Sequence, residues 1–231
     1  MTHSRSILVV LAHPDDESFP IGGTLARYCV EGTRIVLVSA TRGEAGIPGL
    51  AAERVGQIRE GELLAASQIL GLAEVRFLGY RDGELAHTDR DEVIARLVEA
   101  MNEIRPQVVI TFGPDGISGH ADHVAISGLA TAAFDRANLA AALFYVSPSN
   151  ATFQACGVVA SQAVTDRPIA AIDVSRYLVQ KVRAMQCHAS QHQPCPGMPE
   201  EEAAHLSCHE YFSIARPESW RGDVTDLFEV L

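Results

Sequence analysis

Hydrophobic positions along the chain fall into short continuous runs that alternate with longer stretches of helical spacing. The runs are rich in Val, Ile and Leu, which is typical of strands buried on both faces of a sheet. They cover residues 6–12, 34–40, 75–79, 107–112, 142–146, 169–174 and 209–216. The stretches of helical spacing cover residues 21–31, 50–70, 91–104, 121–137 and 175–190. This alternation predicts an α/β fold, a Rossmann-like three-layer α/β/α sandwich with a mainly parallel sheet.

Length and charge narrow the class of protein. The 231 residues suit one domain, and we expect residues 1–231 to form it. The net charge of −11 argues against nonspecific binding to nucleic acid or to an anionic membrane, because both need a positively charged footprint. The sequence has no run of about 18 apolar residues that would span a membrane. Its apolar N-terminal stretch is too short for a signal peptide, so we expect a cytoplasmic protein.

Two charged clusters follow two of the predicted strands. The first, AHPDDE at residues 12–17, follows the apolar run 7–11, and the second, GPDGISGHADH at residues 113–123, follows the run 107–112. In parallel α/β sheets, ligands bind beyond the carboxyl ends of the strands. The sequence therefore predicts that the two clusters meet at one edge of the sheet.

The two clusters together contain the donor atoms of a hydrolytic metal site. His13 and Asp16 are three residues apart, as are His120 and His123, which lie close together if a helix begins there. Two histidines and one aspartate make a three-ligand set for zinc that leaves a fourth position open. Water in that position becomes a nucleophile near neutral pH.

Each cluster also holds a spare carboxylate. Asp15 lies between the two proposed ligands of the first cluster, within reach of the water, and Asp122 lies beside the histidine pair. An alternative, in which the acids only favour a helix N-terminus, would leave the second cluster unexplained. A phosphate-binding loop at Gly22-Gly23 is disfavoured, because the G-x-G-x-x-G pattern is missing and acids precede it. We expect these glycines to let a helix pack closely on the sheet.

The combination of AHPDDE with GHADH (119–123) resembles the LmbE/PIG-L-like family of zinc-dependent N-acetylglucosaminyl deacetylases. Further segments agree, namely GGTLARYCVEG (22–32), TRGEAG (41–46), IREGELLAASQILG (58–71) and KVRAMQCHASQ (181–191). The resemblance covers most of residues 6–192 and, more loosely, 209–212. It implies that residues 1–231 form a single LmbE/PIG-L-like deacetylase domain.

The resemblance also implies which residues hold the metal. His13, Asp16 and His123 match the family's zinc ligands, with one Zn²⁺ per chain. A two-histidine, one-aspartate set also accepts Fe²⁺, so the identity of the metal stays open.

The remaining charged residues of the clusters match the proton-transfer groups. Asp15 matches the general base that activates the water. His120 matches the general acid, or the cation that stabilises the tetrahedral intermediate. Asp122 would orient His120 and raise its pKa, as a carboxylate beside a histidine does.

Five further residues are expected near the substrate. Arg59 matches a substrate-binding arginine, and Asp82 matches a carboxylate that contacts sugar hydroxyls in some relatives. Arg42 and Glu44 follow the second predicted strand at the same sheet edge, where they contact substrate or form a solvated loop pair. The late H-x-S-Q segment would bring His188 toward the active site.

The cysteines admit more than one interpretation. Their number, five, is odd and their spacing sparse, which favours reduced thiols in a cytosolic protein. A cluster near the C-terminus is either a set of free thiols and surface histidines or a second, structural zinc site. It consists of Cys187, His188, His192, Cys195, Cys208 and His209.

Together these expectations predict a metal-dependent hydrolase that removes the acetyl group from an N-acetylated amino sugar, N-acetylglucosamine or a glycoside of it. One alternative is an amidase of the same fold acting on thiol-sugar conjugates or another N-acyl substrate. Another is a noncatalytic carbohydrate- or metal-binding protein, although binding alone needs neither Asp15 nor His120. By resemblance we expect a homo-oligomer, a trimer or a hexamer.

Overall fold

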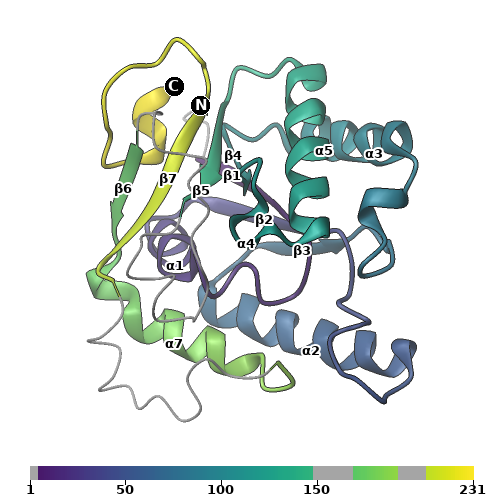
Figure 1. Ribbon diagram of the computed structural model, residues 1–231. Coiled ribbons are helices and arrows are strands. Elements are labelled where there is room, and N and C mark those ends of the chain that lie inside the picture. The colour runs from purple at the N-terminus through teal and green to yellow at the C-terminus, as the bar shows by residue number, and fades with distance from the viewer. Residues whose placement is uncertain (1–4, 148–168, 192–206) are drawn as a thin grey trace.

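The computed structural model describes residues 5–147, 169–191 and 207–231, whose strands form one sheet (Figure 1). The strands are β1 (Ser6–Leu11), β2 (Arg34–Ser39), β3 (Glu74–Phe77), β4 (Val108–Phe112), β5 (Ala142–Val146), β6 (Ile169–Asp173) and β7 (His209–Arg216). The helices are α1 (Gly22–Val30), α2 (Ala52–Leu70), α3 (Arg90–Ile104), α4 (Gly116–Gly119), α5 (Ala121–Ala137) and α7 (Leu178–Cys187). Short 3₁₀ turns are η1 (Leu85–His87), η2 (Ser175–Tyr177) and η4 (Leu227–Val230).

The sheet is mainly parallel, as the sequence predicts. Its order is β3-β2-β1-β4-β5-β7-β6, with parallel pairing from β3 through to β5. Only β7 runs antiparallel, between β5 and β6. Helices α3 and α5 pack together on one face, and α1, α2 and α7 pack together on the other (Figure 1). The predicted three-layer α/β/α sandwich is therefore confirmed.

The central strands form the core on which the site is built. Residues Ile7 to Ala12 are at most 1 % exposed, as are the inner positions of β4. Each fully buried aliphatic side chain of this kind contributes about 1.5–3 kcal/mol through the hydrophobic effect. The strands thus hold the polar loops that follow them on a rigid base.

The N-terminus of α1 is held by residues distant in the sequence. Ile21 at the cap position offers no side-chain hydrogen bond, and instead Glu210 of β7 accepts the N–H groups of Gly23 and Thr24 at 3.0 and 2.7 Å. Lys181 of α7 pairs with the same carboxylate at 2.6 Å. This buried pair joins β7 and α7 to the start of α1.

Gly23 also shows why glycine follows the first cluster. A Cβ at this position would lie 2.7 Å from Cβ of Val174, closer than real side chains approach. The expectation that the glycine pair allows close packing of helix on sheet is confirmed for Gly23.

The predicted elements recur with small changes at their ends. The predicted helix 175–190 is divided into η2 and α7, and the predicted strand 75–79 is β3.

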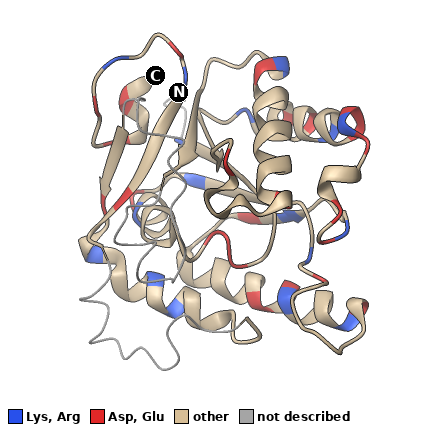
Figure 2. Ribbon diagram, viewed as in Figure 1, with Lys and Arg blue, Asp and Glu red and all other residues tan. Residues whose placement is uncertain are grey.

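Among the described residues, no helix is long and apolar enough to cross a membrane. Basic and acidic residues are interspersed along α3 and the N-terminal half of α2, whereas α5 carries charged residues only near its ends (Figure 2). That residues 1–231 form a single domain stays a prediction.

Candidate metal centre and active site

The two charged clusters meet at the carboxyl ends of β1 and β4, which are neighbours in the sheet. His13 follows β1, and His123 lies in the first turn of α5, which α4 and a short loop connect to β4. The Nδ1 atom of His13 lies 3.2 Å from Nε2 of His123. The ring of His123 stacks on Phe112, the last residue of β4, with ring centroids 4.2 Å apart. The prediction that the clusters meet at one sheet edge is confirmed.

Asp16 completes a triangle of donor atoms with the two histidines. Its carboxylate oxygens lie 3.8 Å from Nδ1 of His13 and 3.3 Å from Nε2 of His123. Tetrahedral coordination with bonds of about 2.0–2.2 Å places neighbouring ligand atoms about 3.3–3.6 Å apart. Asp16 thus offers a different oxygen toward each histidine, and the chemistry of these three side chains suits a small cation such as zinc; ligand atoms of His13, His120 and His123 also lie within 4.8 Å of one another.

The far side of the His13 ring is held by two carboxylates. Its Nε2 atom lies 3.0 Å from Asp82 and 3.1 Å from Asp122. Burial alone would lower the pKa of His13, but hydrogen bonds to Asp122 and Asp82 raise it to about 10. A carboxylate that accepts from one ring nitrogen leaves the other free to bind a metal and makes it more basic.

Asp122 does not orient His120, and that prediction is corrected. Its carboxylate contacts His13 and accepts the backbone N–H groups of Gly83 and Leu85 at 2.7 and 3.1 Å. These donors lie in the loop after β3, so the carboxylate is turned toward that loop and away from His120. Asp122 instead joins the loop to the metal-binding histidine.

His120 is the N-cap residue of α5. Its Nδ1 atom accepts the backbone N–H of Asp122 at 3.2 Å, which places the ring hydrogen of the neutral form on Nε2. Burial lowers the pKa of His120, and the neighbouring His13 and His123 lower it further, which outweighs the opposite effect of Asp122. Asp122 thus raises the pKa of His120 as expected, but the net shift is downward.

Asp15 lies between the predicted ligands His13 and Asp16 in a backbone conformation that is rare for a residue other than glycine, with φ of 105°. Its carboxylate accepts a hydrogen bond from Nη2 of Arg59 at 3.1 Å. Burial and the negative charge of Asp16 raise the pKa of Asp15 to about 7, although Arg59 opposes the shift. A carboxylate with a pKa in this range exchanges protons readily near neutral pH.

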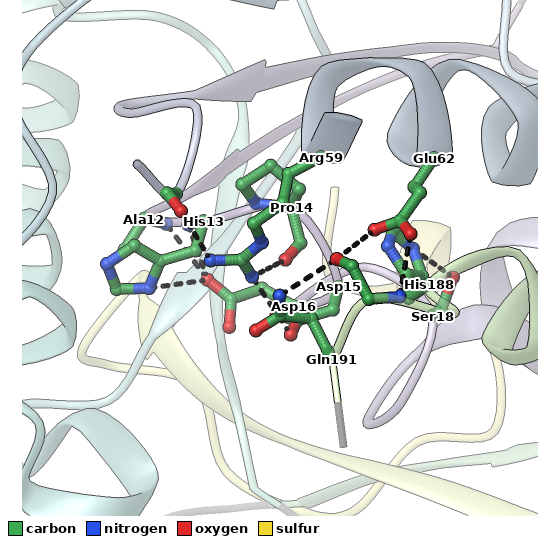
Figure 3. A network of polar contacts seen from close by, with 12 residues as sticks. Ala12, His13, Pro14, Asp15, Asp16, Ser18, Arg59, Glu62, His188 and Gln191 are labelled. Atoms are coloured by element: carbon green, nitrogen blue, oxygen red, sulfur yellow. Dashed lines mark hydrogen bonds and ion pairs between the residues drawn. The ribbon is translucent and has the colours of Figure 1, made fainter. Parts of the chain in front are cut away.

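Arg59 connects α2 to the same site. It is 4 % exposed and also donates to the carbonyl oxygen of Gly43. A further bond goes to the carbonyl oxygen of Pro14 (Figure 3). The residue thus fixes the loop after β1 as well as the carboxylate of Asp15. Its contact with substrate stays a prediction.

A pocket of about 340 Å³ opens over these residues. It is lined by the predicted ligands, Asp15, Arg59, Asp82 and His120, and also by Ala45, Gly46 and Gln191. Its size suits a small polar molecule.

Comparison with known proteins decides the family. The family model described as GlcNAc-PI de-N-acetylase, PIG-L, matches residues 8–134, more than half of the chain. The chain belongs to the PIG-L (LmbE-like) family. The resemblance inferred from the motifs is confirmed, and so is the expectation of an amino-sugar N-deacetylase at the level of the family.

Relatives of this PIG-L family member support the assignment over nearly the whole chain. The 1D-myo-inositol 2-acetamido-2-deoxy-alpha-D-glucopyranoside deacetylase of Streptomyces avermitilis is 33 % identical, covering 97 % of this chain and 97 % of the relative. The fold is shared with N,N'-diacetylchitobiose deacetylase of Pyrococcus horikoshii, at a TM-score of 0.71 and 20 % identity over 99 % of this chain and 89 % of that one.

The same fold also carries another chemistry. The 4-carboxy-2-hydroxymuconate hydratase GalB of Pseudomonas putida has a TM-score of 0.70 and 19 % identity over 94 % of this chain and 99 % of that one. The fold alone therefore does not fix the reaction, and the side chains of the site must carry the argument.

Three predicted substrate contacts of this family member do not line the pocket. Arg42 faces α2, where it pairs with Glu53 and Glu60 at 3.6 and 3.4 Å and not with Glu44. Glu44 packs against Gly56 of the same helix. His188 is 2 % exposed and buried away from the pocket, so its prediction as a substrate contact is corrected.

Gln191 is a pocket residue that the sequence reasoning missed. It is held in place by its neighbour Ser190, whose N–H and hydroxyl both donate to Glu62 of α2 at 2.7 Å. The H-x-S-Q segment indicates that this part of the chain lies near the site, but the sequence-based prediction places the substrate contact at its histidine and not at its glutamine.

The C-terminal cluster shows no second metal site among the residues that the structure describes. Groups of side chains able to hold a metal occur in those ranges only around His13. Cys29, Cys187 and Cys208 are free thiols, in agreement with the expectation of reduced cysteines. His192 and Cys195 lie outside the described residues.

Proposed function

We propose that this PIG-L family member is a zinc-dependent hydrolase that removes the acetyl group from an N-acetylated amino sugar, N-acetylglucosamine or a glycoside of it. The convergence of one nitrogen each from His13 and His123 with the Asp16 carboxylate, beside Asp15 and inside a pocket, carries the proposal. Inert binding of a sugar would not require an acid-base group at this place.

His13, Asp16 and His123 would hold the zinc ion. When bound, the ion polarises the acyl oxygen and makes water a nucleophile near neutral pH. Asp82 and Asp122 accept from Nε2 of His13 and so direct its Nδ1 toward the metal, which would displace any proton from that nitrogen on binding.

Asp15 takes the proton of the attacking water. Arg59 holds its carboxylate at one oxygen, which fixes the direction in which the other oxygen accepts. The amine of an amide leaves only when it is protonated, so the proton that Asp15 has accepted is returned to the nitrogen of the sugar.

His120 stabilises the negative charge that develops on the acyl oxygen. Its neutral ring carries the hydrogen on Nε2, because Nδ1 accepts the N–H of Asp122. A general-acid role would need a second hydrogen on Nδ1, in conflict with this backbone donor. We therefore assign His120 as a hydrogen-bond donor of the oxyanion-hole type.

The substrates of the relatives indicate which substrate to test first. The similarity to the inositol glycoside deacetylase of Streptomyces avermitilis covers nearly the full length of both chains, so the N-acetylglucosaminyl glycoside of inositol is the first substrate to test. Arg59, Asp82 and Gln191 supply polar groups to the pocket wall, where they would contact sugar hydroxyls. A cytoplasmic location and a trimeric or hexameric assembly stay predictions.

A substrate screen tests the proposal. Metal-loaded protein is incubated with N-acetylglucosamine, its inositol glycoside, chitooligosaccharides and an N-acyl thiol-sugar conjugate, and released carboxylic acid is measured. Release of acetate from an amino sugar supports the proposal, while cleavage of the thiol-sugar conjugate alone supports the amidase alternative. Tight metal binding without hydrolysis of any member would favour a noncatalytic binding protein.

A further inference from the structure

The strained backbone conformation of Asp15 must be stabilised by contacts with neighbouring groups. Its φ of 105° is one that side-chain-bearing residues rarely adopt, and such conformations persist only where neighbouring groups fix them. Arg59 accounts for part of this, since it holds the carboxylate of Asp15 and the carbonyl of Pro14. The backbone N–H of Asp15 requires a partner of its own.

Glu17 provides that partner. Its side chain is fully buried, and one carboxylate oxygen accepts the N–H of Asp15 at 3.0 Å. The other oxygen accepts from the hydroxyl of Ser18 and from Nε2 of His188, the latter at 2.7 Å. Both oxygens are thus occupied, and the carboxylate cannot turn without breaking a contact.

His188 is the only basic side chain bonded to Glu17 in the parts of the chain that the structure describes. It is 2 % exposed and follows α7, far from Glu17 in the sequence. Buried carboxylates need a paired or hydrogen-bonded partner, so loss of His188 would leave Glu17 with only the Ser18 hydroxyl and the backbone N–H of Asp15, two uncharged donors. In the view of Figure 3, Arg59 and His188 lie on opposite sides of Asp15.

We propose that Glu17 and His188 form a positioning pair that fixes the backbone of Asp15 and thereby aims its carboxylate at the reacting water. Neither residue lines the pocket, so they act through Asp15 and not on the substrate. The proposal rests on the proposed function of Asp15 as the proton acceptor.

A second buried pair on the same helix serves as the matched control. Lys181 and Glu210 are 5 % and 4 % exposed. The carboxylate of Glu210 accepts backbone N–H groups of α1, whereas that of Glu17 accepts the N–H of Asp15. Replacing His188 or Lys181 in each case removes a basic side chain from a buried carboxylate. Only the loss of His188 should change the backbone conformation of Asp15.

The experiment measures kcat, KM, metal content and unfolding for the wild type, His188→Leu, His188→Gln and Lys181→Met. We expect His188→Leu to lower kcat about 10- to 100-fold at unchanged KM and metal content, because small misplacements of a catalytic group have effects of this size. His188→Gln keeps an N–H donor and should restore kcat to within about threefold of wild type. Lys181→Met should lose stability but keep its kcat. Equal effects of His188→Leu and Lys181→Met on kcat would overturn the proposal.

A double variant keeps the test decisive if His188→Leu does not fold. Glu17→Met with His188→Leu replaces the pair by apolar groups, a change that buried ion pairs often tolerate. We expect a folded protein with bound metal and a kcat about 10- to 100-fold below wild type. A wild-type kcat in this variant would contradict the proposal.

A crystal structure of the same double variant separates this proposal from the proposed function. The positioning pair predicts that φ of Asp15 leaves the positive region in the variant. An unchanged φ would refute the pair whatever the activity, and an inactive wild type would refute only the proposed function.

Discussion

The Nε2 atom of His13 lies 3.1 Å from a carboxylate oxygen of Asp122, while Nδ1 of the same ring faces His123. One side of the ring thus donates to a buried carboxylate, and the other presents its lone pair to the predicted metal position. Asp122 in turn accepts two backbone N–H groups from the loop after β3. Asp122, together with Asp82 at 3.0 Å from the same Nε2, therefore favours Nδ1 of His13 as the nitrogen available to the metal.

Asp122→Asn should weaken metal binding about 10- to 100-fold. The amide N–H₂ would face Nε2 of His13 and favour the tautomer with its hydrogen on Nδ1. Competition with a chromophoric zinc chelator measures the affinity. Asp135→Asn is the matched control, because Asp135 lies on the same helix and pairs with Arg216 at the surface. Equal affinity in the two variants would contradict the assignment.

His120→Gln should retain more activity than His120→Ala. The glutamine amide offers an N–H donor near the position of Nε2, whereas alanine offers none, and loss of one oxyanion donor costs about 100- to 1,000-fold in kcat. Steady-state kinetics of both variants, with metal content checked, measure the difference. If both variants fall to the same kcat, His120 acts as a proton donor, which a glutamine cannot replace.

Gly23→Ala should destabilise the protein by about 1–3 kcal/mol, because its Cβ would overlap Val174. Gly61→Ala is the control, since Gly61 lies exposed on α2 and nothing lies within 4 Å of the added Cβ. That change should stabilise the helix by about 0.5–1 kcal/mol. Urea unfolding measures both changes in the free energy of unfolding, provided that its dependence on urea concentration is the same in all variants. A stable Gly23→Ala variant would show that α1 can move away from Val174.

The sequence was sufficient for what depends on local pattern. The continuous aliphatic run before His13 predicts a buried strand, and the parallel sheet then requires the two clusters to meet at one edge. Local pattern does not predict that β7 inserts antiparallel between β5 and β6, because strand order depends on long-range packing.

The partners of individual side chains were harder to predict. The motif AHPDDE does not indicate the partner of Glu17, because its bond to His188 spans 171 residues. The turn of Asp122 toward His13 depends on backbone donors in the loop after β3, which no spacing within the second cluster indicates. Sequence motifs indicated that the two clusters meet, but the mutual orientation of their side chains required the fold.

The stability that His188 contributes should depend on pH. Burial alone would lower the pKa of His188, but the hydrogen bond and charge of Glu17, with Asp15 and Glu62, raise it above its usual value. The charged pair is therefore fully formed below the unfolded-state pKa of about 6.5, and its contribution is lost as pH rises through the higher folded-state value. The free energy of unfolding of wild type, relative to His188→Gln, should be largest near pH 6 and shrink toward alkaline pH. Denaturant titrations across this range measure it, and a difference that grows with pH would contradict the pairing.

The central claim is that Asp15 moves the proton of the attacking water beside a metal held by His13, Asp16 and His123. Acetate release from the N-acetylglucosaminyl glycoside of inositol, measured for metal-loaded wild type and Asp15→Asn, tests it most directly. We predict equal metal content in both proteins and a kcat lower by about 100- to 10,000-fold in the variant, the size expected for loss of general acid-base catalysis. Near wild-type acetate release by fully metal-loaded Asp15→Asn would contradict the account.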